Sequence, residues 1–318
     1  MRYSVAIPVL NEEETLPVLA ERLGAALGGL GDDWEAVFVD DGSTDRSWEI
    51  LQELHEGDAR FGAVRLSRNF GHQAACASGL AHATGDVVIL MDGDLQDPPE
   101  LIPELTAKID EGYDVVYAVK RGRREGWTKR LAFRTFYKVQ TGLSSVDMPE
   151  GAGTFSALTR RVVDCINAMP ESNRYVSGLR AYTGFRQTGL EFDRPARHAG
   201  EPRQTVGRLF KLAMDGIFSF SHVPAKLATW LGLIAATTCL VFSAVVLYKK
   251  LVSQTAILGW TSTMLSILFL GAVQLLCLGI LGEYIARIYD EVRHRPLYVV
   301  ADRICAAHSD NATNAGAH

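Results

Sequence analysis

Residues 86–99 read DVVILMDGDLQDPP, an apolar run that ends in a cluster of acidic and polar residues. The run from Asp86 to Met91 has the length of a buried strand. Alternate side chains of an extended segment point the same way, so Asp92 and Asp94 can face one ion, while Gly93 admits a closely approaching backbone or ligand. Carboxylate oxygens favour Mg²⁺ or Mn²⁺, and Mg²⁺ keeps open positions for phosphate oxygens. The stretch therefore predicts a strand that presents two carboxylates to a divalent metal.

The sequence on both sides of this stretch alternates between strand and helix patterns. The strand patterns are Tyr3 to Leu10, Ala36 to Val39, Ala63 to Leu66, Asp86 to Met91 and Val115 to Val119. This order implies a mostly parallel sheet covered by helices on both faces, a Rossmann-like α/β fold. Ligands of such sheets bind beyond the carboxyl ends of the strands.

Helix patterns fill the intervals between the strands. Asn11 and Glu14 have the spacing of a capping box and predict a helix start, and four leucines follow on one helical face. A second helix pattern carries Trp48, Leu51 and Leu54, and a third spans Gln73 to Ala83. The four leucines of the first helix are Leu16, Leu19, Leu23 and Leu27.

Three of the predicted strands end in acidic or polar clusters. These are residues 8–12 (PVLNE), residues 40–45 (DDGSTD) and residues 92–99 (DGDLQDPP). A single Asp at a strand end is usually a helix cap or a turn residue. Three clusters at one edge of a sheet would repel one another unless a cation or hydrogen bonds lie between them. We therefore expect a binding site at this edge.

The composition excludes several other classes of protein. The chain has 318 residues and a formal net charge of -5, which argues against nucleic acid as its main partner. None of its five cysteines lies in a C-x-x-C pair. They are typical of small buried residues in a reducing compartment, not of a disulfide framework or a zinc site.

Two long apolar runs follow residue 226. Leu227 to Leu247 carries no charge, and Ser262 to Gly282 has Gln274 as its strongly polar residue. A helix of about 20 apolar residues crosses a bilayer core of about 30 Å, so both runs are predicted transmembrane helices. The alternative is a pair of buried core helices. Basic residues on the outer flanks outnumber those of the connecting loop, which predicts cytoplasmic flanks and termini of a multi-pass protein of the cell membrane.

These patterns predict four segments. Residues 1–205 form a cytoplasmic catalytic domain, and residues 206–226 form a juxtamembrane amphipathic helix, for which an ordinary packing helix is an equal alternative. Residues 227–286 form the two-helix anchor. Residues 287–318 form a cytoplasmic tail whose end is disordered.

The chain resembles the family 2 glycosyltransferases of the GT-A fold, and within them the polyprenyl-phosphate sugar transferases. It is most similar to the bactoprenol glucosyltransferase group, with dolichol-phosphate mannose synthase as a more distant relative. The resemblance runs from Tyr3 to Arg295. It is carried by IPVLNEEETL, FVDDGSTD, LSRNFGHQAA, LMDGDLQDPPE, RLAFRTFYK, AGTF, DRPARHAGEP and the two terminal apolar runs.

The resemblance implies a role for each matching residue of the donor site. Nucleotide-pocket residues would be Pro8, Leu10, Glu12, Asp40 and Asp41, with Ser67, Arg68 and Gly93 as further donor contacts. Metal- and diphosphate-binding residues would be Asp92, Asp94 and Gln96, with Mg²⁺ or Mn²⁺ as the cofactor. For Pro8 and Leu10, strand-end packing is an equal interpretation.

The acceptor would be the phosphate of a polyprenyl lipid, bound by arginines whose planar fork grips phosphate. The basic run after the fifth strand matches this position, although such runs are usually solvated faces. The implied residues are Arg121, Arg123, Arg130, Arg134 and Arg197. Two departures affect this part of the site: Thr154 replaces a frequent acid in the AG-x-F segment, and Ser177 replaces a frequent base.

The resemblance implies an enzyme, a hexosyltransferase that moves one sugar from a nucleotide-sugar to polyprenyl phosphate with inversion at C1. The phosphate is already anionic at neutral pH and needs no strong base. UDP-glucose is the expected donor and GDP-mannose the alternative, and we expect a homo-oligomer. A processive polysaccharide synthase is disfavoured because no Q-x-x-R-W motif is present. A non-catalytic nucleotide-sugar-binding scaffold is the alternative from another class.

Overall fold

The computed structural model describes residues 2–31, 33–120, 152–171, 174–192, 232–235, 237–238, 241, 248 and 259–306. The chain divides into two units. The first unit comprises Met1–Thr141, Val146–Thr205 and Pro296–His318. The second comprises Gly142–Ser145 and Val206–Arg295.

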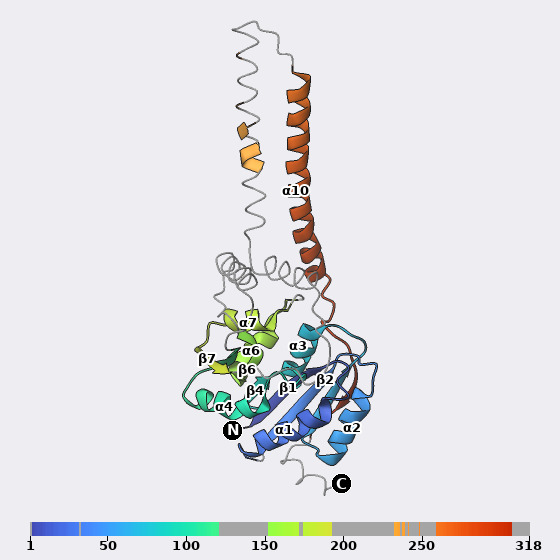
Figure 1. The fold of residues 1–318 in the computed structure, drawn as a ribbon, viewed down its shortest axis with the longest axis vertical. Coiled ribbons are helices and arrows are strands. Elements are labelled where there is room, and N and C mark those ends of the chain that lie inside the picture. Colours follow the sequence, from blue (N-terminus) through green and yellow to red (C-terminus); the bar gives the residue numbers. More distant parts are fainter. Residues whose placement is uncertain are drawn as a thin grey trace. The chain divides into compact units, whose positions relative to one another are not determined.

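The first unit contains one sheet, whose described strands lie in the order β7-β5-β6-β4-β1-β2-β3-β8 (Figure 1). The run β4-β1-β2-β3 is parallel, while β6 and β8 pair in antiparallel fashion with β4 and β3. The strands are β1 Tyr3–Val9, β2 Trp34–Asp40, β3 Phe61–Leu66, β4 Val87–Leu90, β5 Val115–Lys120, β6 Ala152–Thr159, β7 Gln187–Phe192 and β8 Val300–Ile304.

Helices lie on both faces of the sheet (Figure 1). The leucine face of α1 packs with α2 and α4 in one apolar cluster, and α3, α6 and α7 contribute to a second cluster. Adjacent residues of β1 divide between the two, since Val5 and Ile7 join the first cluster and Ala6 the second. The helices are α1 Leu16–Gly28, α2 Ser47–Gly57, α3 His72–His82, α4 Ile102–Asp110, α6 Arg160–Ala168 and α7 Val176–Tyr182, with the short η1 at Pro99–Leu101.

The five predicted strands and the first three helices are confirmed, with small shifts of their ends. All four leucines of the α1 face are buried, each contributing about 1.5–3 kcal/mol of hydrophobic free energy. The predicted capping box is wrong, because α1 begins at Leu16 and no side chain caps it. Asn11 instead adopts a left-handed conformation with φ 54° and contacts the loop after β2.

Three strands of the sheet, β6, β7 and β8, were not predicted. The segment AGTFSALT forms β6 between β4 and β5, although its small and polar residues give no strand signal. The segment Val300–Ile304, which the sequence assigns to a tail, forms β8 along the free side of β3. Ser67 N also donates to Val299 O at 2.8 Å. The chain after the second unit therefore returns to the sheet and covers one of its edges.

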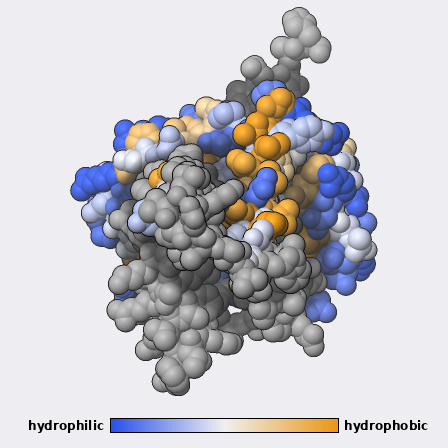
Figure 2. All heavy atoms as spheres, turned by 90° about the horizontal axis from the view of Figure 1, so that it is seen from above, coloured by the Kyte–Doolittle hydropathy of each residue, from blue (hydrophilic) through white to orange (hydrophobic). Residues whose placement is uncertain are grey.

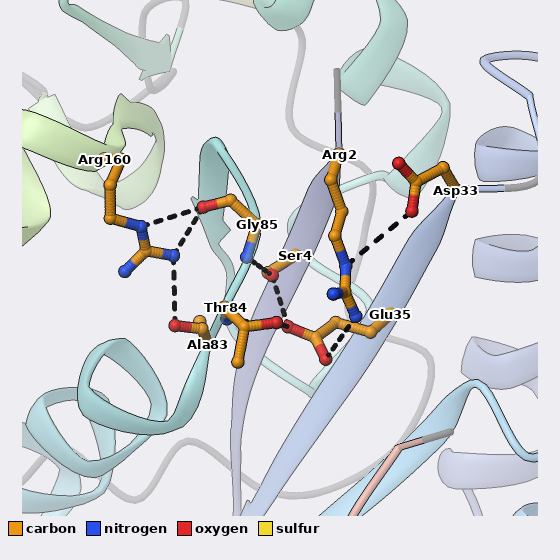
Figure 3. Close-up of polar contacts among 8 residues, drawn as sticks. All are labelled: Arg2, Ser4, Asp33, Glu35, Ala83, Thr84, Gly85 and Arg160. Carbon is orange, nitrogen blue, oxygen red and sulfur yellow. Dashed lines mark hydrogen bonds and ion pairs between the residues drawn. The ribbon is translucent and has the colours of Figure 1, made fainter. Parts of the chain in front are cut away.

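A hydrogen-bonded network lies at the amino ends of the parallel strands (Figure 3). Glu35 of β2 is 2% exposed and accepts hydrogen bonds from Ser4 Oγ, Thr84 Oγ1, Thr84 N and Arg2 Nη2 at 2.6–3.2 Å. Burial alone would raise the pKa of Glu35, but these hydrogen bonds and the Arg2 charge lower it below the ordinary value. The network joins β1, β2 and the loop before β4.

The second unit contains the long helix α10, Trp260–Val292. Its segment Phe269–Ala286 is long and apolar enough to cross a membrane, and none of that segment is buried. Apolar surface is openly exposed among the described residues in Figure 2. α10 supplies many of the exposed large side chains, among them Phe269, Leu275 and Ile285. A contiguous exposed apolar surface of this kind marks a contact with lipid or with another protein.

The second apolar run thus corresponds to a described helix. The first run lies mostly outside the described residues, where positions 232–235, 237–238 and 241 are helical. The predicted amphipathic helix at 206–226 and the boundaries at 205 and 226 also lie outside the described residues.

Candidate active site

The three acidic strand ends meet at one edge of the sheet, as predicted. The order of the strands places β1 between β4 and β2, so the chain runs outward from β1 through β2 to β3 and then crosses back to β4 on the other side of β1. Such a reversal opens a crevice beyond the carboxyl ends of the strands, where ligands bind in open α/β sheets. The ends of β1, β2 and β4 carry residues 8–12, 40–45 and 92–99. This edge is therefore the candidate active site.

The loops after β1 and β2 are locked together by their polar side chains. Asn11 N donates to Ser43 Oγ at 2.9 Å, and Asn11 Oδ1 accepts from Thr44 N at 2.8 Å. Glu12 N donates to Ser47 Oγ at 2.9 Å, and the Glu12 carboxylate accepts from Thr15 Oγ1 at 2.7 Å. Pro8 is buried, and Leu10 and Glu12 are half-buried. The clamp holds the predicted nucleotide residues of β1 beside those of β2.

Asp40 and Asp41 lie side by side at the end of β2, and both are buried. Asp40 Oδ1 accepts from Ser43 N at 2.8 Å, and Oδ2 lies 3.4 Å from Arg65 Nε without a hydrogen bond. Asp41 accepts from the backbone N–H groups of Phe70 and Gly71 at 2.7 and 3.0 Å. Burial raises the pKa of Asp41, helped by the Asp40 charge and opposed by those two hydrogen bonds.

The turn after Asp41 needs glycine. Gly42 has φ +72°, and a Cβ at this position would lie 2.6 Å from the carbonyl carbon of Arg68. The Arg68 guanidinium stacks on the Phe70 ring at 4.1 Å, and Ser67 and Arg68 are exposed. The loop after β3 is thus packed against the loop after β2, which brings the Ser67 and Arg68 backbone to the same edge.

The Asp92-x-Asp94 segment follows β4 in the predicted position. Asp94 Oδ1 accepts from Gln96 N at 3.1 Å, and Asp97 Oδ2 accepts from Asp92 N at 3.2 Å. A Cβ on Gly93 would lie 3.1 Å from Pro8 O, so only a small residue fits easily between β1 and this segment. Asp92 and Asp94 are half-buried, whereas Gln96 is buried.

His72 is a site residue that the sequence analysis missed. It is the first residue of α3, and its Nε2 lies 3.5 Å from Asp92 Oδ1 and 3.5 Å from Cys76 Sγ. Burial raises the pKa of the Cys76 thiol, and the Asp92 charge adds to this effect. The available signal was its place in NFGHQAA, a polar loop that follows a strand end.

The residues present fit a divalent cation. Asp92 Oδ1 is buried and accepts no hydrogen bond, which leaves a charged oxygen available to a ligand. Oxygen donors of Asp92, Asp94 and Gln96 are the kind that Mg²⁺ and Mn²⁺ prefer. Within the described ranges, no group of three His, Cys, Asp or Glu residues is placed to hold a metal. A cation here would therefore take its remaining ligands from substrate or water.

The predicted acceptor arginines lie outside the described residues; they are Arg121, Arg123, Arg130, Arg134 and Arg197. Thr154 and Ser177 are described. Thr154 lies on β6, the neighbour of β4, and Ser177 Oγ on α7 donates to Gly153 O at 3.3 Å. The AG-x-F segment is therefore positioned beside the acidic edge.

Two protein families match the sequence. Residues 4–166 match the family described as "Glycosyl transferase family 2". Residues 223–288 match the "GtrB C-terminal hairpin", a range that includes both long apolar runs. The first match covers every acidic strand end of the candidate site.

Individual proteins are similar over nearly the whole chain. The "Uncharacterized glycosyltransferase YkcC" of Bacillus subtilis (strain 168) is 42% identical over 301 residues, covering 94% of this chain and 93% of the relative. The "Bactoprenol glucosyl transferase" of Shigella phage SfV is 38% identical over 301 residues, covering 94% and 98%.

A solved structure shares the fold of the first unit. It is glucosyl-3-phosphoglycerate synthase from Mycobacterium tuberculosis in complex with Mn²⁺, uridine-diphosphate and glucosyl-3-phosphoglycerate. The TM-score is 0.50 at 19% identity, over 69% of this chain and 79% of that one. At this identity the likeness is one of fold.

Proposed function

The chain belongs to glycosyl transferase family 2, with a GT-A α/β fold, and we propose that it transfers one sugar from a nucleotide-sugar to polyprenyl phosphate. The observation that carries the proposal is the acidic carboxyl edge of the sheet. There Asp92 presents a buried carboxylate oxygen that no hydrogen bond satisfies. A buried polar atom without a partner calls for a physical explanation, and a bound cation is the one that suits a carboxylate oxygen.

The polyprenyl acceptor is supported by the relatives and by the second unit. A relative with 38% identity over nearly its full length is named a bactoprenol glucosyl transferase. The matched C-terminal hairpin and the exposed apolar segment Phe269–Ala286 of α10 support an anchor in the membrane, where a polyprenyl chain resides. We further propose that the anchor has two helices, that the catalytic domain is cytoplasmic and that the protein forms a homo-oligomer.

The residues of the edge divide the work of donor binding. Pro8, Leu10 and Glu12 line the nucleotide pocket, held in place by the clamp between the first two loops. Asp40 and Asp41 bind the base and ribose, and the fixed carboxylate of Asp41 cannot reorient because two backbone N–H groups hold it. Ser67, Arg68 and Gly93 complete the donor site.

The reaction needs positioning more than proton transfer. An oxygen of the lipid phosphate forms a bond to C1 of the sugar while the bond from C1 to the diphosphate breaks, and the nucleoside diphosphate leaves. The nucleophile is anionic at neutral pH, since the second pKa of a phosphate monoester is about 6. Displacement from the face opposite the leaving group gives inversion. Arg121, Arg123, Arg130, Arg134 and Arg197 would hold the attacking phosphate.

Asp92, Asp94 and Gln96 would hold Mg²⁺ or Mn²⁺ at this edge. When bound, such a cation neutralises charge on the leaving diphosphate. The carboxylates would act on the donor diphosphate only through such a cation, because like charges repel, and they follow directly after the close approach of Gly93 to Pro8. We propose UDP-glucose as the donor, with GDP-mannose as the alternative.

The test is a transfer assay with the full chain in detergent or lipid, Mg²⁺, polyprenyl phosphate and a panel of labelled UDP- and GDP-sugars. We expect one sugar to enter the lipid fraction. Asp94→Ala should lower that transfer by roughly 10²–10³-fold, the loss typical of a group that stabilises developing charge. Glu104→Ala is the matched control, because Glu104 is an exposed carboxylate on α4 and belongs to none of the three acidic strand ends, residues 8–12, 40–45 and 92–99.

A scaffold that binds nucleotide-sugar without turnover predicts a different result. It would bind a nucleotide tightly by calorimetry, yet give no lipid-linked product with any donor. That outcome would overturn the enzymatic proposal. Transfer that survives Asp94→Ala undiminished would leave the enzyme but remove the proposed role of the acidic edge.

A further inference from the structure

Arg180 of α7 is a buried guanidinium with few partners. It is 3% exposed, its Nη1 donates to Gly153 O at 3.1 Å, and its Cζ lies 5.1 Å from the centroid of the Tyr117 ring. Its Nε–H is buried and donates no hydrogen bond. Burial lowers the pKa of Arg180 to about 10, with Tyr175 and Tyr117 opposing this effect. The side chain is therefore charged at neutral pH.

Other arginines of the first unit have carboxylate or carbonyl partners. Arg161 pairs with the buried Asp114, and Arg2 pairs with Glu35, although the Nε–H of Arg2 is also buried without a hydrogen bond. Arg160 donates to two backbone carbonyls, Gly85 O and Ala83 O (Figure 3). Within the described part of the chain, no carboxylate pairs with Arg180. A buried charge without a counter-charge is costly to the fold, which indicates that an anion from outside the chain is missing.

Arg180 is connected with the acidic edge through Gly153 and strand β6. Arg180 and Ser177 both donate to Gly153 O, the carbonyl directly before Thr154. In the antiparallel pairing of β4 with β6, Leu90 lies opposite Ser156 at the end of the ladder, and Asp92 and Thr154 each lie two residues beyond this pair.

The start of α7 also touches the start of α3. Val176 N donates to Gln73 Oε1 at 2.9 Å, and the preceding residue His72 lies 3.5 Å from Asp92 Oδ1. Two independent routes, one through β6 and one through α3, thus lead from α7 to the carboxylates.

We propose that Arg180 binds a phosphate oxygen of a substrate at the acidic edge, an assignment that rests on the proposed function. A guanidinium suits this task because it stays charged when buried and offers several N–H donors in one plane. The phosphate has two possible sources, the diphosphate of the nucleotide-sugar and the monoester of the lipid. Gly153 O occupies one donor of the guanidinium, and the chain supplies no acceptor for the buried Nε–H.

The experiment compares three variants of the full chain in two binding arms. Calorimetry measures the affinity for UDP, or GDP if that is the donor nucleotide, in one arm, and for a short-chain polyprenyl phosphate in the other. Arg180→Met removes the charge at similar volume, Arg180→Lys keeps the charge without the planar fork, and Ser177→Ala removes the other donor to Gly153 O. Thermal unfolding is recorded for each variant.

We expect Arg180→Met to weaken one of the two ligands by about 10- to 100-fold, as loss of a charge-assisted hydrogen bond does. The affected arm identifies the source of the phosphate. Arg180→Lys should recover part of the affinity, and Ser177→Ala should change both affinities by less than about threefold. Arg180→Met should unfold at the same or a higher temperature than the wild type, because a buried charge without a counter-charge is removed.

Unchanged affinity in both arms would overturn the proposal. So would an equal loss in Ser177→Ala, because Arg180 would then act by holding the Gly153 carbonyl. Should Arg180→Met fail to fold, Arg180→Gln takes its place in both arms, since it keeps a donor for that carbonyl. Both arms work without turnover, so a wild-type protein that transfers no sugar contradicts the proposed function and still leaves the role of Arg180 to be decided.

Discussion

The two edges of the same sheet differ in how many hydrogen bonds their buried carboxylate oxygens accept. At the amino edge, Glu35 is 2% exposed and accepts four hydrogen bonds from Ser4, Thr84 and Arg2 (Figure 3). At the carboxyl edge, Asp40 Oδ2 and Asp92 Oδ1 are buried and accept no hydrogen bond. Both edges are built from the same strands, β1 and β2, with the segments that flank β4.

The difference separates structural charge from functional charge. A buried carboxylate whose acceptor sites are filled by the chain stabilises the fold and has nothing left to offer a ligand. A buried carboxylate with an open oxygen costs stability and is kept only where a ligand completes it. On this reasoning, substitutions at the two edges should dissociate activity from stability.

The largest expected effect is on activity at the carboxyl edge. Asp92→Asn preserves shape but removes the charge, and should lower kcat/KM by roughly 10³-fold, about 4 kcal/mol of transition-state free energy. Its melting temperature should stay unchanged or rise, because Asp92 Oδ1 accepts no hydrogen bond whose loss would destabilise the fold. The measurements are the lipid-transfer assay and thermal unfolding of the same preparations. A large fall in melting temperature would show that Asp92 is structural.

The opposite result is expected at the amino edge. Glu35→Gln should lower the free energy of unfolding by about 3 kcal/mol, because it leaves Arg2 and the surrounding donors without their charged acceptor. The folded variant should retain the kcat/KM of the wild type. Chemical denaturation of detergent-solubilised protein gives the stability.

Asp33→Asn is the matched control for Glu35→Gln. Asp33 faces the same Arg2 at 3.8 Å, but its side chain is 62% exposed. Exposed ion pairs contribute about 0–1 kcal/mol, so this variant should hardly change the free energy of unfolding. If both substitutions cost the same, the burial of Glu35 is not what makes it stabilising.

The sequence predicted those parts of the fold that repeat a pattern. The leucines of α1 recur at helical spacing and are all buried. The acidic strand ends were predictable as a site because parallel strands place their carboxyl ends at one edge. The capping box failed because the Asn11 side chain bonds to Thr44, a residue 33 positions away, instead of to its own helix. Local spacing carries no information about such a distant partner.

The parts that the sequence did not predict depend on the same kind of long-range contact. β8 is mostly exposed and exists because β3 offers it a free edge. β6 has few large apolar residues, and its place is fixed by β4 and β5 on either side. His72 and Arg180 look like ordinary polar residues in the sequence. Their significance lies in what they touch and, for Arg180, in what is missing around it.

The smallest expected effect is a difference in acid sensitivity between the edges. The pKa of Glu35 is lowered in the folded state, so its contribution to stability is present above the unfolded pKa of about 4.5 and is lost as the pH falls through the folded pKa. The pKa of Asp41 is raised, chiefly by burial. Its folded form takes up a proton earlier than its unfolded form does, so its contribution becomes more favourable as the pH falls.

Unfolding free energies of the wild type, Glu35→Gln and Asp41→Asn, measured from pH 6 downward in about half-unit steps, test this sign. The stability advantage of the wild type over Glu35→Gln should shrink below about pH 4.5. Its stability relative to Asp41→Asn should improve as the pH falls through the raised folded pKa of Asp41 and level off below the ordinary Asp pKa of 3.8. The test uses the change of each stability difference with pH. The constant loss of hydrogen bonds that Asn cannot reproduce therefore does not affect the result. If the stability of the wild type relative to both variants changes in the same direction, the pKa values of Glu35 and Asp41 are not shifted in opposite directions. The Asp41 carboxylate is then a structural group like Glu35.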